Sequence, residues 1–284
     1  MVDLQKIIRL HPAQPDDVGD LITRRPLPGP GIARIGAFLF LNHHGPQVYP
    51  PGSNGLPFGP HPHRGFETVT FIIDGELAHR DSGGYESIIG PGGVQWMTAG
   101  RGIVHEEVSP EDFRRDGGAM EILQLWVNLP ARLKMTAPHY IGLQASDIPA
   151  ITEDGATVNL ISGEYQGRKG PIASLTGVFM STVKMKAGAH VRFDRLTGRD
   201  VFLYVVRGSV TIGGLKASAW NLVELSDGER LEIEAARKSL LLFGHAEPIH
   251  EPVVAYGPFV MNTEDEIRQA YADYRAGEFG VPMA

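Results

Sequence analysis

Short runs of alternating apolar and polar residues, separated by turn residues, fill the chain between residues 66 and 129. A period of two is typical of a β-strand, because successive side chains of a strand point to opposite faces of its sheet. The clearest run is FETVTFII, which is followed by Asp74-Gly75 and then by ELAHRD. An Asp-Gly pair between two such runs favours a type I′ hairpin turn, since that turn needs positive φ at both central residues. We therefore expect antiparallel strands joined by tight turns.

The second half of the chain repeats this pattern after an interruption. The alternation is lost between residues 131 and 150 and resumes in runs such as VFLYVVRG and SVTIGG. The 35 glycines and 21 prolines suit many short strands and turns better than a helical bundle. The sequence predicts an all-β protein with one domain at 1–133, a linker at 134–150 and a second domain at 151–284.

One helix is predicted, at about 263–276, where it would close the second domain. Thr263 and Glu266 have the spacing of a capping box, which satisfies backbone amides at a helix N-terminus. Four residues share one face of this helix and are expected to pack against the core: Ile267, Ala270, Tyr271 and Tyr274. Gly277 is well placed to end the helix.

Composition and charge exclude several classes of function. The net charge of −7 is spread along the chain without a basic block, so direct nucleic-acid binding is not expected. No apolar run approaches the roughly 20 residues that span a bilayer, and the N-terminus lacks the apolar region of a signal peptide. We expect a cytoplasmic protein. Because the chain has no cysteine, any metal must be held by nitrogen and oxygen ligands.

Two histidine-bearing stretches carry the clearest functional signal. GPHPHRGFETVTF contains His61 and His63, and AGRGIVHEEV contains His105 and Glu107. Residues i and i+2 of an extended chain point to the same side, so each pair would face one way. If the stretches lie on neighbouring strands of a barrel with both pairs facing inward, three imidazoles and one carboxylate meet. Such a set suits Fe(II), Mn(II), Ni(II), Cu(II) or Zn(II), and ligand type alone does not choose among them.

The remaining histidines lack companions at ligand spacing. A lone histidine beside a strand more often forms an ordinary hydrogen bond than binds a metal. These residues are therefore interpreted as structural: His11, His43, His44, His79, His139 and His250.

Several stretches together resemble the pirin family of the cupin superfamily. HPHRGFE at 61–67 resembles the first cupin motif, H-x-H-x3-E, and GRGIVH at 100–105 resembles the second, which ends in a metal-binding histidine. The stretches most similar to pirins are HPHRGFETVTF, GGVQWMTAGRGIVHEE, LQLWVNLP and EPVVAYGPFVMNTEDEI. The resemblance implies a bicupin, that is, two antiparallel, jelly-roll-like β-barrels with a short C-terminal helix.

The resemblance also implies a ligand set with iron as the expected ion. The ligands would be His61, His63, His105 and Glu107, and Fe(II) would be favoured over Mn, Ni, Cu or Zn. The general cupin motif would instead take its carboxylate from Glu67, which we assign to a supporting position beside the ligands.

Two stretches depart from the family pattern. The second half has His190 but no H-x-H, so its barrel is not expected to bind metal, although His190, His245 and Glu247 remain a weaker alternative site. The Pro- and Gly-rich stretch at 43–60 is expected to form a long loop that enters the first site and shapes its entrance.

The resemblance implies two alternative functions. Some pirins cleave flavonols such as quercetin with dioxygen and release carbon monoxide. This predicts a quercetin 2,3-dioxygenase-like enzyme for a flavonol-like or related hydroxylated aromatic substrate, with Glu107 as catalytic base as well as ligand. Eukaryotic pirins are proposed to be regulators, which predicts instead an iron-binding, redox-sensing protein that docks on a protein partner without turnover. The open coordination positions of a four-ligand site favour the enzyme.

Four further residues flank the ligand pairs. Arg64 and Arg101 are interpreted as salt-bridging residues, with binding of an anionic substrate as the alternative. Trp96 and Met97 precede the second pair and are expected either to line the pocket or to pack in the core.

Overall fold

The computed structural model describes residues 2–281 and consists mostly of antiparallel β-strands, which confirms the all-β class. Most of the strands form two barrels, each built from a seven-stranded and a four-stranded sheet. Three α-helices and one 3₁₀ turn, Ala145–Asp147, lie between or after the strands. None of the described helices is long and apolar enough to span a membrane.

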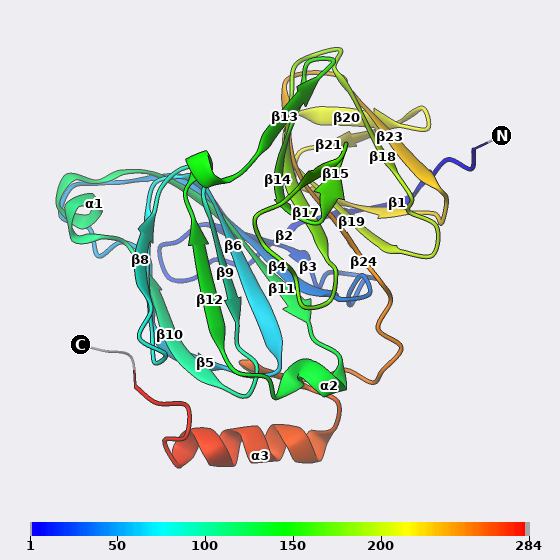
Figure 1. The fold of residues 1–284 in the computed structure, drawn as a ribbon. Helices are drawn as coiled ribbons and strands as arrows, with labels where there is room; N and C mark the ends of the chain where they lie inside the picture. Colours follow the sequence, from blue (N-terminus) through cyan, green and yellow to red (C-terminus); the bar gives the residue numbers. More distant parts are fainter. Residues whose placement is uncertain (1, 282–284) are drawn as a thin grey trace. The chain divides into compact units, whose positions relative to one another are not determined.

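The first barrel contains both histidine-bearing stretches (Figure 1). Its seven-stranded sheet has the order β12 (His139–Leu143), β9 (Val94–Thr98), β6 (Phe66–Asp74), β11 (Gly118–Asn128), β4 (Phe38–Tyr49), β3 (Thr23–Leu27) and β2 (Gln14–Pro15). Its four-stranded sheet has the order β5 (Phe58–His63), β10 (Ile103–Val108), β7 (Leu77–Asp81) and β8 (Glu86–Ile89). The associated helices and hairpin are α1 (Glu111–Asp116), α2 (Ala131–Lys134), β25 (Val254–Tyr256), β26 (Phe259–Met261) and α3 (Glu264–Arg275).

The second barrel repeats this architecture. Its seven-stranded sheet has the order β1 (Ile7–Pro12), β22 (Asn221–Leu225), β19 (Asp200–Arg207), β24 (Ser239–Ala246), β17 (Phe179–Met185), β14 (Ala156–Ser162) and β13 (Ala150–Glu153). Its four-stranded sheet has the order β18 (His190–Asp194), β23 (Arg230–Ala235), β20 (Ser209–Ile212) and β21 (Leu215–Ser218). A small hairpin joins β15 (Glu164–Tyr165) and β16 (Arg168–Lys169).

The two compact units are discontinuous in sequence, unlike the contiguous domains that the sequence analysis expected. Residues 2–14 and 25–39 belong to the unit of the second barrel, where β1 pairs with β22. Residues 249–281 belong to the unit of the first barrel. The expected linker at 134–150 contains β12, which pairs with β9 of the first barrel.

The turn at Asp74-Gly75 is not the expected hairpin. β6 pairs with β9 and β11 on its two edges, so no edge is left for β7, which pairs with β8 and β10 in the other sheet. The turn therefore carries the chain from one sheet of the barrel to the other. Gly75 has φ +84°, and a Cβ there would come within 2.7 Å of the Ala119 carbonyl oxygen.

The stretch at 43–60 is also not the expected long loop. Residues 43–49 continue β4, where the Gly45 amide donates to the Ile22 carbonyl at 2.7 Å. Residues 58–63 already form β5, so the irregular connection is limited to 50–57. Backbone pairing with the neighbouring edge segment explains the difference, because it overrides the local preference of proline and glycine for loops.

The C-terminal helix matches its prediction closely. The Thr263 side chain accepts from the Glu266 amide, and the Glu266 side chain accepts from the Thr263 amide, which is the expected capping box. Ile267 and Ala270 are buried in one hydrophobic cluster, whereas Tyr274 is 38% exposed and contacts this cluster through Phe279, at a ring-centroid distance of 5.7 Å.

The interiors of the two barrels differ in character. The second barrel is filled by aliphatic and aromatic side chains, among which Phe243 stacks on Phe193 with ring centroids 3.8 Å apart. The first barrel buries a row of polar residues instead, including Thr70, Gln95 and Glu107. Burying polar groups is costly unless they are paired, so this interior points to a site.

Candidate metal centre in the first barrel

Three histidines converge on the wall formed by β5 and β10. The two strands are antiparallel neighbours, with His105 directly opposite His61 and Ile103 opposite His63. One ligand atom from each of His61, His63 and His105 lies within 4.8 Å of the others. The ring centroids are 4.4 Å apart for His61 and His105 and 5.0 Å apart for His63 and His105. The expected placement on neighbouring strands is confirmed for the histidines.

His105 lacks the hydrogen bonds that a buried imidazole normally makes. The residue is 0% exposed, and neither Nδ1 nor Nε2 has a hydrogen-bond partner within the described part of the chain. A buried polar group without a partner costs about 1–3 kcal/mol, so such groups persist where a ligand or an ion satisfies them. The donor set therefore fits a metal ion.

The protonation states of the histidines suit metal binding. Burial, together with the neighbouring His61, lowers the pKa of His63 to about 3. Burial also lowers the pKa of His105, with further contributions from His61, His63 and His79. Both rings are therefore neutral at physiological pH, which is the form of imidazole that ligates a metal.

Backbone carbonyls fix the orientation of the other two rings. The Nδ1 atom of His61 lies 2.8 Å from the Gly59 oxygen, and Nδ1 of His63 lies 3.2 Å from the Pro258 oxygen. A carbonyl oxygen only accepts hydrogen bonds, so Nδ1 carries the proton in both rings. The lone pair then resides on Nε2, which is the atom available to bind a metal ion.

Glu107 lies on the same strand as His105, but its carboxylate is not part of the three-histidine group. One oxygen accepts from the Thr70 hydroxyl at 2.8 Å, and the other accepts from the Gln124 side-chain amide. The register of β10 against β5 shifts between His105 and Glu107. Coordination by Glu107 therefore remains a prediction. To bind a metal ion, a carboxylate oxygen of Glu107 must either contact the ion while it keeps its hydrogen bond or give that hydrogen bond up.

Glu67 projects from β6 on the side opposite Thr70, because their positions differ by an odd number of residues. One of its oxygens accepts from the Thr98 hydroxyl at 2.6 Å, and burial raises the pKa of the carboxyl group. Since Thr70 contacts Glu107, Glu67 faces away from that carboxylate. This placement gives Glu67 a framework position on the other face of the sheet and not the expected position beside the ligands.

Polar and aromatic residues that the sequence analysis did not single out surround the histidines. Thr70 lies opposite Gln95 on β9 and opposite Gln124 on β11, so the three side chains form one row across the sheet. Trp126 stacks against Phe40 at 4.7 Å and meets the edge of His63 at 5.3 Å. Polar residues at every second position of a buried strand, such as Thr68 and Thr70, are the signal that could have revealed this row.

His79 is more than an ordinary structural histidine. Its Nε2 lies 2.8 Å from an Asp81 oxygen, its ring stacks on Tyr140 at 3.9 Å, and it is 5.4 Å from the ring of His105. Because a carboxylate only accepts, Nε2 is the donor. Asp81 therefore fixes the orientation of a ring beside the group of three histidines.

The flanking residues have structural partners. Arg64 forms an ion pair with Asp273 at 2.7 Å, which is the salt bridge expected of this residue, although its partner is distant in sequence. Arg101 is exposed. Met97 packs with Ala99, Ile103 and Tyr140, which favours the core interpretation.

The three candidate residues of the second barrel are not brought together. His190 is exposed on β18, and Glu247 is 80% exposed beside Arg199. Arg199 Nε donates to Nδ1 of the largely buried His245 at 2.6 Å, and burial followed by this guanidinium lowers the pKa of His245 to about 3.

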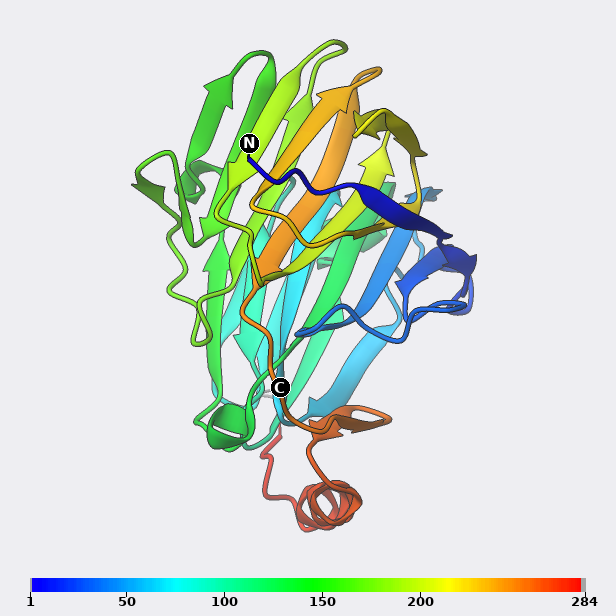
Figure 2. The ribbon, with the colours of Figure 1, turned by 90° about the vertical axis from the view of Figure 1, so that its right-hand side faces the viewer.

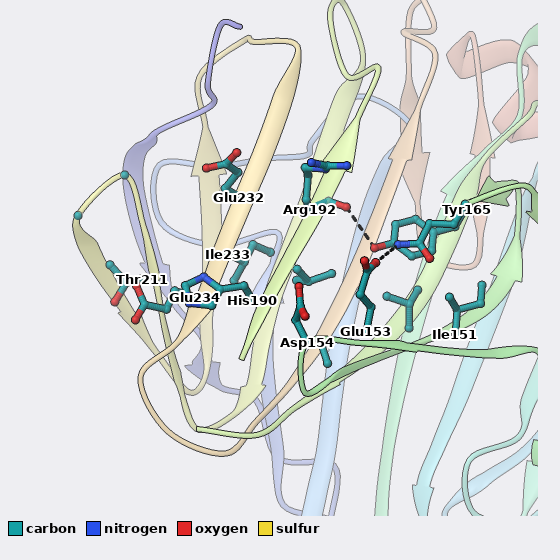
Figure 3. A pocket seen from close by; sticks show the side chains of 16 residues that line it. Ile151, Glu153, Asp154, Tyr165, His190, Arg192, Thr211, Glu232, Ile233 and Glu234 are labelled. Carbon is teal, nitrogen blue, oxygen red and sulfur yellow. Dashed lines mark hydrogen bonds between the residues drawn. The ribbon is translucent and has the colours of Figure 1, made fainter. Parts of the chain in front are cut away.

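His190 instead borders a pocket of about 460 Å³ in the second barrel (Figure 3). The carboxylates of Glu153, Asp154, Glu232 and Glu234 line the same pocket. Glu153 accepts from Gln166, and the Tyr165 hydroxyl donates to the Arg192 carbonyl at 3.2 Å. The only described group of three or more potential metal ligands that meet is the one in the first barrel.

Comparison with known proteins identifies the family. The Pirin family model matches residues 21–127, and the Pirin C-terminal cupin domain model matches residues 180–280. A protein of Pseudomonas aeruginosa, provisionally named a quercetin 2,3-dioxygenase, is 42% identical over 86% of this chain and 87% of its own length. A pirin-like protein of Caulobacter vibrioides is 39% identical over 96% of this chain and 98% of its own.

The fold comparison agrees with the sequence comparison. The crystal structure of quercetin 2,3-dioxygenase from Acinetobacter baumannii superimposes with a TM-score of 0.91 at 34% identity, covering 99% of this chain and 100% of that one. The two cupin barrels and the family matches span most of the sequence, so the chain belongs to the pirin family.

Proposed function

We propose that the first barrel holds one divalent metal ion, Fe(II) before Mn, Ni, Cu or Zn, and is the active site of a dioxygenase for flavonol-like or related hydroxylated aromatic substrates. The observation that carries the proposal is the buried His105, whose two ring nitrogens lack partners while His61 and His63 direct their Nε2 atoms by bonds to backbone carbonyls. The relatives and the solved structure with quercetin 2,3-dioxygenase names support the choice of reaction.

The metal, when bound, would supply open positions for a substrate oxygen and for dioxygen, and would favour the deprotonated form of a ligated hydroxyl. The protein's own contribution begins with Glu107. Thr70 and Gln124 each donate to one of its oxygens, so the carboxylate is held in one orientation. We assign Glu107 as the base that takes the proton from the substrate hydroxyl, in addition to its predicted role as ligand.

The aromatic residues beside the ligands suit a planar substrate. Trp126 and Phe66 lie with ring centroids 4.4 Å apart, and both contact His63. Aromatic rings favour offset stacking or edge contacts with another ring, as a flavonol would provide. The indole Nε1 of Trp126 is buried and has no partner among residues 2–281, so it is a donor for a substrate oxygen.

Metal analysis followed by turnover tests this proposal. Freshly purified protein should contain about one ion per chain, and the metal-loaded protein should consume dioxygen and release carbon monoxide with a panel of flavonols. Removal of the ion with a chelator should abolish turnover, and reloading should restore it. Stoichiometric metal binding without turnover across the panel would favour the alternative, an iron-dependent regulatory protein that docks on a protein partner.

A further inference from the structure

The C-terminal segment lies against the strand that carries His61 and His63. Within the first barrel, α3 lies beyond the ends of β5 and β10, seen from the side in Figure 1 and nearly end-on in Figure 2. The Pro258 carbonyl faces His63 Nδ1 at 3.2 Å, and the Val260 amide donates to the Arg64 carbonyl at 3.0 Å. Residues 258–260 therefore extend along the end of β5, nearly 200 positions away in sequence.

Arg64 connects this segment to the second ligand strand. It directly follows His63 and is 4% exposed. Its Nε donates to the Arg101 carbonyl at 2.5 Å, in the turn that leads into β10, and its Nη1 donates to Asp273 of α3 at 2.7 Å. The guanidinium carbon also lies 4.6 Å from the centroid of the Phe279 ring. One side chain thus joins the end of β5, the start of β10 and the C-terminal helix.

The backbone around Arg64 is held from two further directions. The Gly65 amide donates to the Gly100 carbonyl at 2.8 Å. The buried ammonium group of Lys134 donates to the Gly65 carbonyl at 2.9 Å and to the Val260 carbonyl at 3.1 Å. These bonds leave little freedom for the backbone next to His63.

Stability alone is a weak explanation for the pair of Arg64 and Asp273. The Arg64 side chain is buried and that of Asp273 is 15% exposed, and an ion pair at such a site often contributes little to stability, because its charges lose hydration when they pair. Its bonds are directional, however, because the planar guanidinium presents its donors in a fixed geometry, which the rotating ammonium of lysine does not reproduce. The arrangement is suited to fixing geometry.

We infer that Arg64 and Asp273 are positioning residues that set the spacing of the histidine ligands on β5 and β10, so that α3 controls the metal affinity of the first barrel. The inference rests on the metal site of the proposed function. Groups that orient ligands in this way typically change metal affinity about 10- to 100-fold when they are removed.

Cobalt(II) titration of the metal-free full-length chain tests the inference, with D273N as the main variant. Asp265 is on the same helix, is exposed and pairs with Arg268 rather than with β5, so D265N is the matched control. We expect the dissociation constant for cobalt to rise about 10- to 100-fold in D273N, the visible absorption bands of bound cobalt to shift, and both to stay unchanged in D265N. D273E, which restores a carboxylate, should recover part of the affinity.

Folding effects are separated by a second variant and a second measurement. R64K keeps the positive charge but loses the planar guanidinium, and like D273N it should weaken cobalt binding. If either variant lowers the melting temperature of the metal-free protein but leaves the cobalt affinity and spectrum unchanged, the pair is only structural and the inference is overturned. A wild-type chain that binds no cobalt would instead overturn the proposed function.

Discussion

Replacing His105 by leucine should have opposite effects on the metal-free and the metal-loaded protein. In the metal-free protein, the buried imidazole leaves one donor and one acceptor unpaired, at a cost of about 1–3 kcal/mol. Leucine has a similar size and no polar atom, and the imperfect fit of such a swap usually costs less than about 1.5 kcal/mol. Metal-free H105L should therefore be more stable than the wild type by about 1 kcal/mol.

The order of stability should reverse when metal is added. An ion at 100 times its dissociation constant stabilises the wild type by about 2.7 kcal/mol, and H105L, having lost a ligand, should gain little of this. Thermal unfolding with and without metal measures both differences, since 1 kcal/mol shifts the melting temperature by about 2–4 °C in a protein of roughly 150–250 residues.

His43 provides the matched control for this experiment. It is as buried as His105, but its Nε2 lies 2.8 Å from the buried carboxylate of Glu121. H43L would remove this hydrogen bond to a buried carboxylate and should destabilise the metal-free protein by about 1–3 kcal/mol. If metal-free H105L loses stability to a similar degree, His105 is an ordinary structural histidine and the reasoning about its unpaired nitrogens is refuted.

Three further predictions follow from the site and the cores. E107Q in the metal-loaded enzyme should reduce turnover by about 10²- to 10⁴-fold, whereas E106Q, on the opposite face of β10, should not; equal rates for both would contradict the assignment of the base. The metal-free protein should lose stability as the pH falls below about 6.5, because the unfolded chain takes up a proton that folded His63 accepts only near pH 3. Between about pH 6.5 and about pH 3 the free energy of unfolding should fall by about 5 kcal/mol, because one pKa unit corresponds to about 1.36 kcal/mol. Denaturant titrations from pH 7 to pH 3.5 that show no decline in this free energy would contradict the prediction. F243A should destabilise the second barrel by about 3–5 kcal/mol without changing metal affinity, which calorimetry and metal titration can check together.

The sequence was sufficient to predict the three histidines and the helix. Strand geometry alone places His61 and His63 on one face, the resemblance to the cupin motifs adds His105, and the capping box of Thr263 and Glu266 is a local signal. The H-x-H pair and the capping box depend only on residues that are close in sequence.

The remaining features depend on contacts between distant segments. The Pro258 carbonyl reaches His63, and Asp273 reaches Arg64, across about 200 residues, and no local pattern encodes such contacts. The pairing of β1 with β22 likewise places the N-terminal residues in the second barrel. Asp74-Gly75 predicts a hairpin, but the partners of β6 are determined by the whole sheet and not by the turn, and they are β9 and β11.

An anomalous diffraction map of metal-loaded crystals tests the central claim most directly. The account predicts a single peak in the first barrel, with nitrogens of His61, His63 and His105 at about 2.0–2.2 Å from it. A peak in the second barrel alone, or no peak in protein exposed to a stoichiometric excess of Fe(II) under anaerobic conditions, would contradict it.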